Sequence, residues 1–246
     1  MYNYKIILQY EGTRYQGWQR QDSTENTIQG KLEALLTKMC GEPVEIQASG
    51  RTDAGVHALG QTANFHCNTE MECEEILEYM NRYLPEDIGV VNVEKAPERF
   101  HSRLHAKGKT YRYRVMTGNV PHVFERRYVY EHPGDLDLEA MRKAAERLCG
   151  VHDFKAFTSA KRGKKSTVRT ISSILIEQNK EEFVFTFTGN GFLYHMVRIL
   201  AGTLIEAGEG KRTPEEIGAV LKSGQRERAG ALVPAKGLTL VAVYYD

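Results

Sequence analysis

Apolar residues in the first hundred positions alternate in some segments and recur at 3.6-residue spacing in others. The alternation predicts a strand over residues 4–10, and the helical spacing predicts a helix that starts near Ile28 and ends at Gly41. Asn26 or Thr27 is the expected N-cap of that helix. The other elements expected here are strands at 44–48, 61–66 and 88–93, and a helix at 73–84 that ends before Pro85.

The second half of the chain shows the same two patterns. Aromatic residues alternate over residues 111–115, which predicts a strand. One predicted helix runs from Leu138 and ends at Gly150, and another begins at Thr213, its expected N-cap. The other expected elements are a helix at 192–206 and strands at 171–177, 183–187 and 238–245.

The order of these elements indicates the fold class. Strands and helices are mixed without strict alternation, which favours an α+β fold with a mostly antiparallel sheet over a doubly wound fold. A boundary near residues 100–108 divides the chain into two similar halves, 1–104 and 105–246.

Composition is typical of an ordinary globular protein. The chain has 246 residues, of which 41% are hydrophobic and 26% charged, so it can bury a sizeable core. No apolar run approaches the ~18 residues of a membrane span, and the first residues lack the pattern of a signal peptide. The four cysteines form no C-x-x-C pair, which indicates reduced thiols. We therefore expect a cytoplasmic protein without contact to a membrane.

A formal net charge of +1 conceals an uneven charge distribution. Residues 70–98 carry nine acidic and two basic residues, a net charge of −7. Residues 99–127 carry eight basic residues and one acidic residue, a net charge of +7, and residues 155–170 add six basic residues and no acidic one. Aromatic residues such as Phe100 and Tyr111 interleave with these charges, as in surfaces that bind phosphates and stack bases. We favour an RNA partner, although a solvated strand face and a loop give the same pattern.

Several kinds of site find no support in the sequence. His101 and His105 have the spacing of a ligand pair, but no third and fourth ligand follow at the spacing of a zinc site. Glycine-rich nucleotide-binding motifs and a G-x-S-x-G nucleophile motif do not occur. We therefore expect no metal site, no nucleotide cofactor and no serine nucleophile.

The best candidate for chemistry is the loop at residues 50–55. Gly50 and Gly55 flank it, and Arg51 is close enough to hold the carboxylate of Asp53 ionised and oriented. A carboxylate placed in this way acts as a nucleophile or as a base. An Asp in a glycine-flanked turn also commonly bonds to its own backbone, so the residues alone leave both roles open.

Two further residues are candidates for the same site. Tyr111 lies within the basic segment and offers a phenol to stack on an unstacked base, or else it packs on the core of the sheet. Arg198 neighbours an apolar stripe on its predicted helix. If it is partly buried it needs an anion such as Asp53, and otherwise its head group reaches solvent.

The loop and several other segments together resemble the tRNA pseudouridine synthase A family. The nine-residue motif GRTDAGVHA at 50–58 is the most specific of them. The other matching segments, in the order of the family, are YEGT (10–13), GWQRQ (17–21), FHSR (100–103), KTYRY (109–113), HDFKAF (152–157) and NGFLYHMVR (190–198). The resemblance covers essentially the whole chain.

This resemblance implies a fold and an activity. The fold would consist of two α/β halves that share a central sheet, with the catalytic cleft between them. The activity would be that of a cofactor-free isomerase that converts uridine to pseudouridine at positions 38, 39 and 40 in the anticodon arm of tRNA, as a homodimer. Asp53 would be the catalytic carboxylate, Tyr111 would contact the flipped base, Arg198 would pair with Asp53, and Arg51 would help to turn out or hold the nucleotide.

One segment departs from the family pattern. The family usually has Gly-Pro-Thr-Ala-Pro-Ala before its last strand, whereas residues 230–235 read GALVPA. This difference leaves open a paralogue that modifies another RNA uridine. Two other readings also remain open at this point, an RNA-binding module without chemistry and a carboxylate-dependent hydrolase of nucleic acid.

Overall fold

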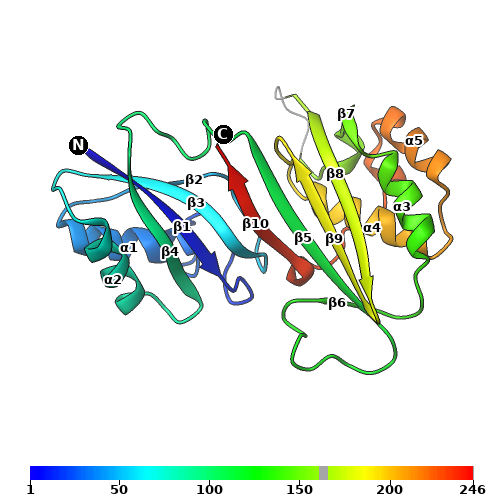
Figure 1. Cartoon of the computed structure of the whole chain (residues 1–246), viewed down its shortest axis with the longest axis horizontal. Coiled ribbons are helices and arrows are strands. Elements are labelled where there is room, and N and C mark those ends of the chain that lie inside the picture. Colours follow the sequence, from blue (N-terminus) through cyan, green and yellow to red (C-terminus); the bar gives the residue numbers. More distant parts are fainter. Residues whose placement is uncertain (161–165, 246) are drawn as a thin grey trace. The chain divides into compact units, whose positions relative to one another are not determined.

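The structure is a computed structural model that describes residues 1–160 and 166–245. The chain forms two compact units (Figure 1), unit 1 with residues 1–107 and 239–246 and unit 2 with residues 108–238. The last strand of the chain therefore belongs to unit 1, whereas the halves expected from the sequence meet between residues 104 and 105. In the described residues no helix is long and apolar enough to cross a membrane.

Unit 1 contains a mostly antiparallel sheet and two helices. Strands β1 and β3 pair with each other along most of their length, β4 pairs with the other edge of β1, and β2 pairs with β3. The last strand, β10, lies parallel to β3. The elements are β1 (Tyr2–Tyr10), α1 (Ile28–Cys40), β2 (Ile46–Ala48), β3 (His57–Cys67), α2 (Cys73–Tyr83), β4 (Ile88–Ala96) and β10 (Leu238–Tyr244).

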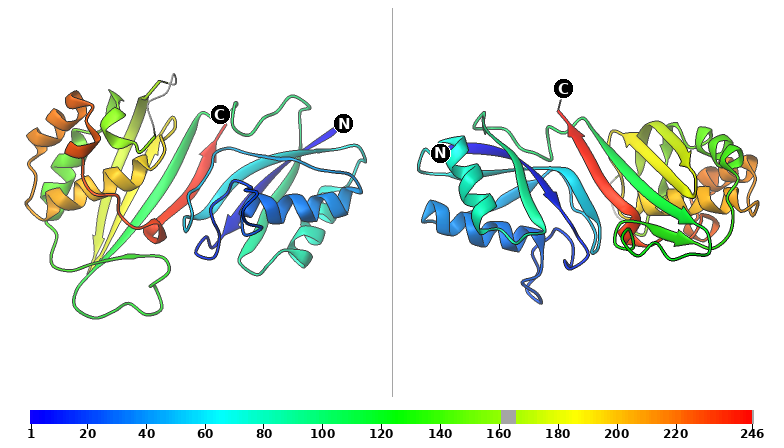
Figure 2. Two further views of the ribbon diagram at one scale, coloured as in Figure 1. Left: turned by 180° about the vertical axis from the view of Figure 1, so that it is seen from behind. Right: turned by 60° about the horizontal axis from the view of Figure 1, so that its bottom comes forward.

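Side-chain alternation gives the sheet of unit 1 one apolar and one polar face. Tyr4, Ile6 and Leu8 of β1 are completely buried, as are the core-facing residues of α1 and α2. Both helices lie on the same side of the strands in both views of Figure 2. Thr27 caps α1 through its side chain, and Gly41 ends the helix in a left-handed conformation, as the sequence predicts.

Unit 2 contains four antiparallel strands, one further short strand and three helices. Its strands pair in the order β5-β9-β8-β7, and β6 adds a short parallel pairing to β5. Phe183, Phe185 and Phe187 of β9 all point into the core. The elements are β5 (Gly108–Thr117), β6 (Tyr130–His132), α3 (Leu138–Glu146), β7 (Gly150–Asp153), β8 (Val168–Asn179), β9 (Glu182–Gly189), α4 (Met196–Gly208) and α5 (Pro214–Ser223), with 3-10 turns at Lys155–Phe157, Arg226–Arg228 and Ala235–Gly237.

The α+β fold with mostly antiparallel strands is thus confirmed, with differences in detail. Strands β6 and β7 were not predicted, because three or four residues are too few to show a period. Helix α3 ends at Glu146, four residues before the predicted end at Gly150, and Gly150 opens β7. Helix α4 begins at Met196 rather than near residue 192, because His195 adopts a left-handed conformation with φ of 64° and interrupts the helical backbone.

Candidate functional site

The loop that carries Asp53 connects β2 to β3 in unit 1. Its ends are anchored by the buried residues Ser49 and Val56, whereas Arg51 is exposed and Asp53 is half-buried. Gly55 has a φ of 78°, which glycine adopts without strain, and the Val56 N–H donates to the Asp53 carbonyl at 3.2 Å. This turn places Asp53 at the start of a long strand.

Buried polar groups hold the loop from the side of the sheet. The hydroxyls of Tyr10 and Thr52 are 2.8 Å apart, and Gln61 donates to the Gly50 carbonyl at 2.9 Å while accepting from the Ser49 hydroxyl at 2.7 Å. Burial raises the pKa of Tyr10 to about 12, against the lowering effect of its bonds to Thr52 and Gln61. The phenol therefore stays protonated near neutral pH and keeps its bond to the residue next to Asp53.

The segment before α1 holds the loop from its other side. The Trp18 N–H donates to the Thr52 carbonyl at 3.0 Å. A Cβ on Gly12 would lie 2.0 Å from the Val56 carbonyl oxygen, and a Cβ on Gly17 would lie 2.8 Å from the Thr52 carbonyl oxygen. Only glycine allows this approach, so the motifs at 10–13 and 17–21 serve to position the Asp53 loop.

Tyr111 lies on β5 in unit 2, opposite Phe187 of β9 in the strand register. The residue is only 8% exposed, and its ring meets the Phe192 ring edge-on, with centroids 5.3 Å apart and planes at 84°. Tyr111 thus packs as a sheet aromatic, as one of the two readings of the sequence expected. This packing fixes the ring orientation and does not by itself test contact with a base.

Arg198 lies in the first turn of α4 in unit 2 and is half-buried. Its Nε donates to the Val233 carbonyl at 2.8 Å, and the Tyr113 hydroxyl donates to the neighbouring Pro234 carbonyl at 2.8 Å. Burial raises the pKa of Tyr113, and the charge on Arg198 opposes this shift in part. Two successive carbonyls therefore orient Arg198 and Tyr113 together.

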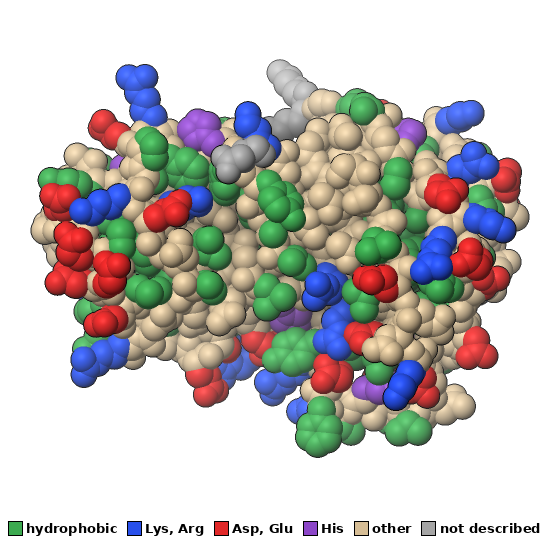
Figure 3. All heavy atoms as spheres, viewed as in Figure 1, with side chains coloured by type: hydrophobic (Ala, Val, Ile, Leu, Met, Phe, Trp, Pro, Cys, Tyr) green, Lys and Arg blue, Asp and Glu red, His purple; other side chains and the backbone are tan. Residues whose placement is uncertain are grey.

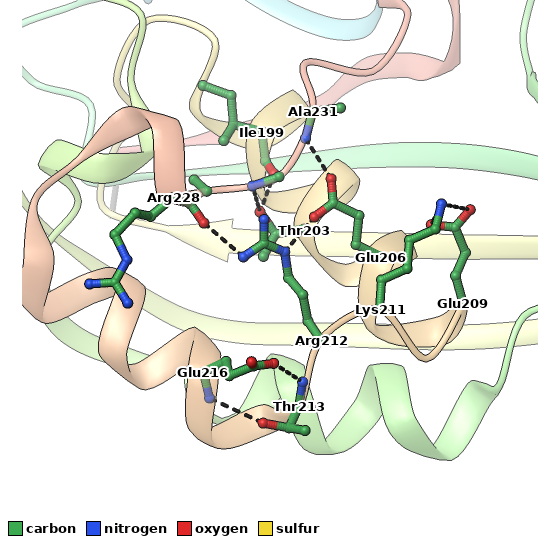
Figure 4. Close-up of polar contacts among 12 residues, drawn as sticks. Ile199, Thr203, Glu206, Glu209, Lys211, Arg212, Thr213, Glu216, Arg228 and Ala231 are labelled. Atoms are coloured by element: carbon green, nitrogen blue, oxygen red, sulfur yellow. Dashed lines mark hydrogen bonds and ion pairs between the residues drawn. The ribbon is translucent and has the colours of Figure 1, made fainter.

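The segment that supplies these carbonyls is fixed to the same helix that carries Arg198. A Cβ on Gly202 would lie 2.1 Å from the Ala231 carbonyl oxygen, and the Gly230 N–H donates to the Thr203 hydroxyl at 2.9 Å. The Ala231 N–H donates to Glu206 at 3.0 Å, as Figure 4 shows. A proline at position 231, the usual residue of the family pattern, has no N–H, so this chain has a bond that the pattern does not allow.

An ion pair extends this attachment to the end of α4. Arg212 binds the carboxylate of Glu206 and donates to the Arg228 carbonyl at 2.7 Å (Figure 4). A pocket of about 360 Å³ lies beside this pair, lined by Glu206, Lys211, Arg212, Glu216, Val220 and Arg228. None of the four candidate residues lines this pocket.

The four candidate residues thus occur in two pairs. Arg51 and Asp53 share one loop of unit 1, and Tyr111 and Arg198 belong to β5 and α4 of unit 2. Further residues support them, above all Tyr10, Gln61 and Val233, to which the sequence assigned no such role. The motifs at 10–13 and 17–21 carried a signal for Tyr10 and Trp18, whereas nothing in the sequence marked Gln61.

The basic residues of segments 99–127 and 155–170 differ in their surroundings. Arg114 pairs with Glu125 at 3.2 Å and with Glu182 at 2.5 Å, whereas Arg99 and Arg103 extend into solvent. On the face shown in Figure 3, basic and acidic side chains are interspersed. Four of the six basic residues in 155–170 lie outside the described residues, namely Lys161, Arg162, Lys164 and Lys165. Among the residues that the structure describes, no group of three or more His, Cys, Asp or Glu could hold a metal ion.

Comparisons with known proteins agree with the motifs. A family model described as tRNA pseudouridine synthase matches residues 6–104 and 144–246. A tRNA pseudouridine synthase A of Bacillus sp. (strain KSM-64) is 47% identical over 245 residues, with 100% of both chains covered. A tRNA pseudouridine synthase A 1 of Clostridium tetani is 45% identical and a tRNA pseudouridine synthase A 2 of Bacillus cereus is 42% identical, each with the same coverage. The chain therefore belongs to the tRNA pseudouridine synthase A family.

Proposed function

We propose that this enzyme converts uridines at positions 38, 39 and 40 in the anticodon arm of tRNA to pseudouridine, with Asp53 as its catalytic carboxylate. As a member of its family the chain is an isomerase that acts on uridine in tRNA. The observation that carries the role of Asp53 is the construction of its loop, which is held from both sides by buried hydrogen bonds and backbone contacts. We expect the enzyme to act in the cytoplasm, because its substrate is tRNA.

The reaction needs positioned acid–base groups rather than an external reactant. The glycosidic C–N bond breaks, the uracil rotates, and a C–C bond forms to the same sugar, so atoms and oxidation state are unchanged. A carboxylate at Asp53 attacks the sugar, adds to the base or removes a proton, and each of these routes fits its half-buried position. A second group removes the proton from the carbon that forms the new bond. No cofactor enters this balance.

The other candidate residues have roles that follow from their supports. The target base must leave the stack to reach the carboxylate, and Arg51, exposed in the same loop, holds or replaces the flipped nucleotide. The Tyr111 ring, whose orientation is fixed by its packing against Phe192, contacts the flipped base. Arg198, oriented by the Val233 carbonyl, supplies the cation that pairs with the Asp53 carboxylate.

We further propose that the enzyme acts as a homodimer that embraces the tRNA, as the resemblance to its family implies. Sedimentation of the pure protein tests this directly. A monomer at the concentration where tRNA is modified would contradict it.

The decisive experiment for the activity compares Asp53→Asn with the wild type on unmodified tRNA transcripts. We expect the variant to bind tRNA but to form no pseudouridine, because the amide is neither nucleophile nor base. Asp22→Asn is the control, since Asp22 is an exposed residue of unit 1 outside the loop, and it should retain activity.

The products separate this proposal from its competitors. Mapped pseudouridine at positions 38, 39 or 40 supports it, and pseudouridine at another RNA position points to a paralogue with a different target. Binding without any product in the wild type would indicate an RNA-binding module, and free uracil or a cleaved strand would indicate a hydrolase.

A further inference from the structure

Two buried asparagines lie on the face of the unit 1 sheet that the helices leave uncovered. Asn3 of β1 is 3% exposed and Asn64 of β3 is 0% exposed. Alternation along β1 puts Asn3 on the face opposite Tyr4, whose ring packs in the core. Burying an amide is unfavourable unless its polar atoms are hydrogen-bonded, so the partners of these side chains show what they are for.

Both asparagine side chains form hydrogen bonds with the segment that follows β4. Asn3 donates to the carbonyls of Pro97 and Phe100, each at 2.9 Å. Asn64 accepts from the N–H and the hydroxyl of the buried residue Ser102, at 2.8 and 2.9 Å. Asn64 also donates to the Phe100 carbonyl at 3.3 Å and to the Asn3 side chain at 3.1 Å.

Aromatic residues complete the attachment of this segment. The Tyr245 hydroxyl donates to the Ser102 carbonyl at 2.8 Å, and the Tyr245 ring lies 5.2 Å from the Phe100 ring. The Lys5 ammonium lies 5.0 Å from the centre of the Tyr245 ring, and the Lys107 N–H donates to the Tyr244 carbonyl at 2.8 Å. The segment 97–107, which we call the clamped loop, has no regular secondary structure and is held in place by these contacts.

The clamped loop presents cations to solvent. Arg99, Arg103 and Lys107 are exposed, and Leu104 between them is 74% exposed. Within residues 1–160 and 166–245 none of these three cations forms an ion pair with a carboxylate. By contrast Arg14 and Arg20 of the same unit pair with Asp87 and Glu33.

The clamped loop lies far from Asp53 within unit 1. The Asp53 loop adjoins His57 at the start of β3, whereas Asn64 lies seven residues further along the same strand, a distance of about 23 Å. Tyr10 and Asn3, at opposite ends of β1, give the same separation. A nucleotide that reacts at Asp53 is too far away to touch the clamped loop.

We propose that the clamped loop is a preorganised phosphate-binding element that grips the sugar-phosphate backbone of tRNA away from the reacting nucleotide. The inference rests on the proposed function for the identity of the polyanion. A loop that is already fixed in one conformation loses little conformational entropy when a phosphate binds to its cations. The buried asparagines therefore favour binding because they stabilise this conformation before the ligand arrives.

The test is the salt dependence of binding to an unmodified tRNA transcript. Each phosphate contact contributes about 0.7 to 0.9 to the slope of log affinity against log salt. The double variant Arg99→Gln/Arg103→Gln should therefore flatten this slope by about 1.4 to 1.8 and weaken binding on the order of tenfold near physiological salt. In turnover experiments the loss should fall on KM rather than on kcat.

A matched control removes the same charge from the other face of the unit. Lys38→Gln/Arg82→Gln changes two exposed cations on α1 and α2, and it should keep the wild-type slope and KM. A loop variant with the wild-type slope, or a control that flattens the slope equally, would overturn the inference. Pseudouridine mapping of the wild-type mixtures reports separately on the proposed function, because wild type that binds tRNA without modifying it contradicts that function alone.

Discussion

Gly12 and Gly17 allow the segment before α1 to lie directly against the Asp53 loop. The contact is between backbones, since a Cβ on either glycine would meet a carbonyl oxygen of residue 52 or 56. Gly17 also has a φ of 86°, which other residues adopt only with strain. The position of the Asp53 carboxylate thus depends on residues about forty positions away in the sequence.

We expect Gly17→Ala to lower kcat strongly, because the new methyl group must push the Thr52 carbonyl away and move Asp53 with it. Gly41→Ala is the control. Gly41 also has a positive φ, of 71°, but no atom lies within 4 Å of its Cβ position. Both variants should lose about 1–2 kcal/mol of unfolding free energy from backbone strain.

Denaturant titrations and single-turnover rates at one temperature separate the two effects. If Gly41→Ala loses as much activity as Gly17→Ala at equal stability, the contact with the loop is not what matters.

At this scale the sequence marks candidate residues, whose roles stay predictions, but it does not mark most of the residues that support them. Asp53 and Arg51 could be singled out as candidates because Gly50 and Gly55 flank their loop. Gln61 was not evident, since a glutamine within a strand has no pattern that distinguishes a buried hydrogen-bonding role from an exposed one. The roles of Asn3 and Asn64 could not be predicted either, because their hydrogen-bond partners are far away in the sequence and are brought near only by the tertiary structure.

Helix α4 and the segment 229–234 act as one element in unit 2. Gly230 lies so close to α4 that its Cβ would be 2.5 Å from the Thr203 backbone nitrogen, and three residues later the Val233 carbonyl orients Arg198. The segment at which this chain departs from the family pattern therefore positions a candidate site residue. Its contacts with Arg198 and Tyr113 use main-chain carbonyls, so a change of side chains at 231–233 leaves them possible.

Gly230→Ala should shift this segment from α4 and release Arg198 from its carbonyl partner. We expect kcat to fall at least about tenfold at a temperature where the variant is folded, with a smaller change in KM, since the guanidinium would lose its fixed orientation. The comparison variant is Gly218→Ala on α5, where no atom lies within 4 Å of the Cβ position.

Gly218→Ala should gain about 0.5–1 kcal/mol of stability from the better helix propensity of alanine and keep its kcat. Thermal unfolding and steady-state kinetics on tRNA measure both quantities. A Gly230→Ala enzyme with wild-type kcat would show that the Val233 carbonyl does not position Arg198.

The elements themselves were predictable where local chemistry was explicit. The N-cap Thr27, the left-handed Gly41 and the Thr213 capping box with Glu216 all appear where the sequence placed helix ends. The start of α4 was predicted too early, because the apolar spacing of residues 192–197 continues the helical period while the backbone at His195 does not. The spacing of apolar residues indicates which positions are buried, but it does not indicate the backbone conformation. The predicted start of α4 was therefore wrong, because the residues before Met196 keep the apolar spacing without a helical backbone.

Over the whole molecule, the near-neutral charge total was less informative than its distribution. The separation of acidic and basic residues into different segments indicated a polyanionic partner. In the structure, Arg99, Arg103 and Lys107 of the clamped loop are the exposed cations that lie on a fixed backbone and form no ion pair among the described residues. The sequence did not indicate that the last strand belongs to unit 1, since β10 pairs with β3 across more than 170 positions of sequence. Such long-range pairing is decided by the packing of the complete unit.

Buried tyrosines make the stability of the whole molecule sensitive to alkaline pH. Burial raises the pKa of Tyr10 and of Tyr245 to about 12 each, with their hydroxyl bonds acting in the opposite direction, whereas the unfolded chain titrates near 10. Below pH 10 both states hold these protons. Between about pH 10 and 12 the unfolded state releases them and the folded state keeps them, so the free energy of unfolding falls as pH rises.

Tyr10, which is fully buried, should lower that free energy by up to about 1.4 kcal/mol per pH unit in this window, and Tyr245, which is only partly buried, should lower it by less. Denaturant titrations of the protein alone between pH 9 and 11.5 measure the slope, and Tyr10→Phe should flatten it more than Tyr245→Phe, with the double variant flattening it by the sum of the two effects. Parallel curves for wild type and Tyr10→Phe would mean that Tyr10 ionises equally easily in both states. The phenol would then not be the buried, protonated partner of Thr52, and the anchorage of the Asp53 loop would have to come from the Gln61 side chain and from the backbone contacts of Gly12, Gly17 and Trp18.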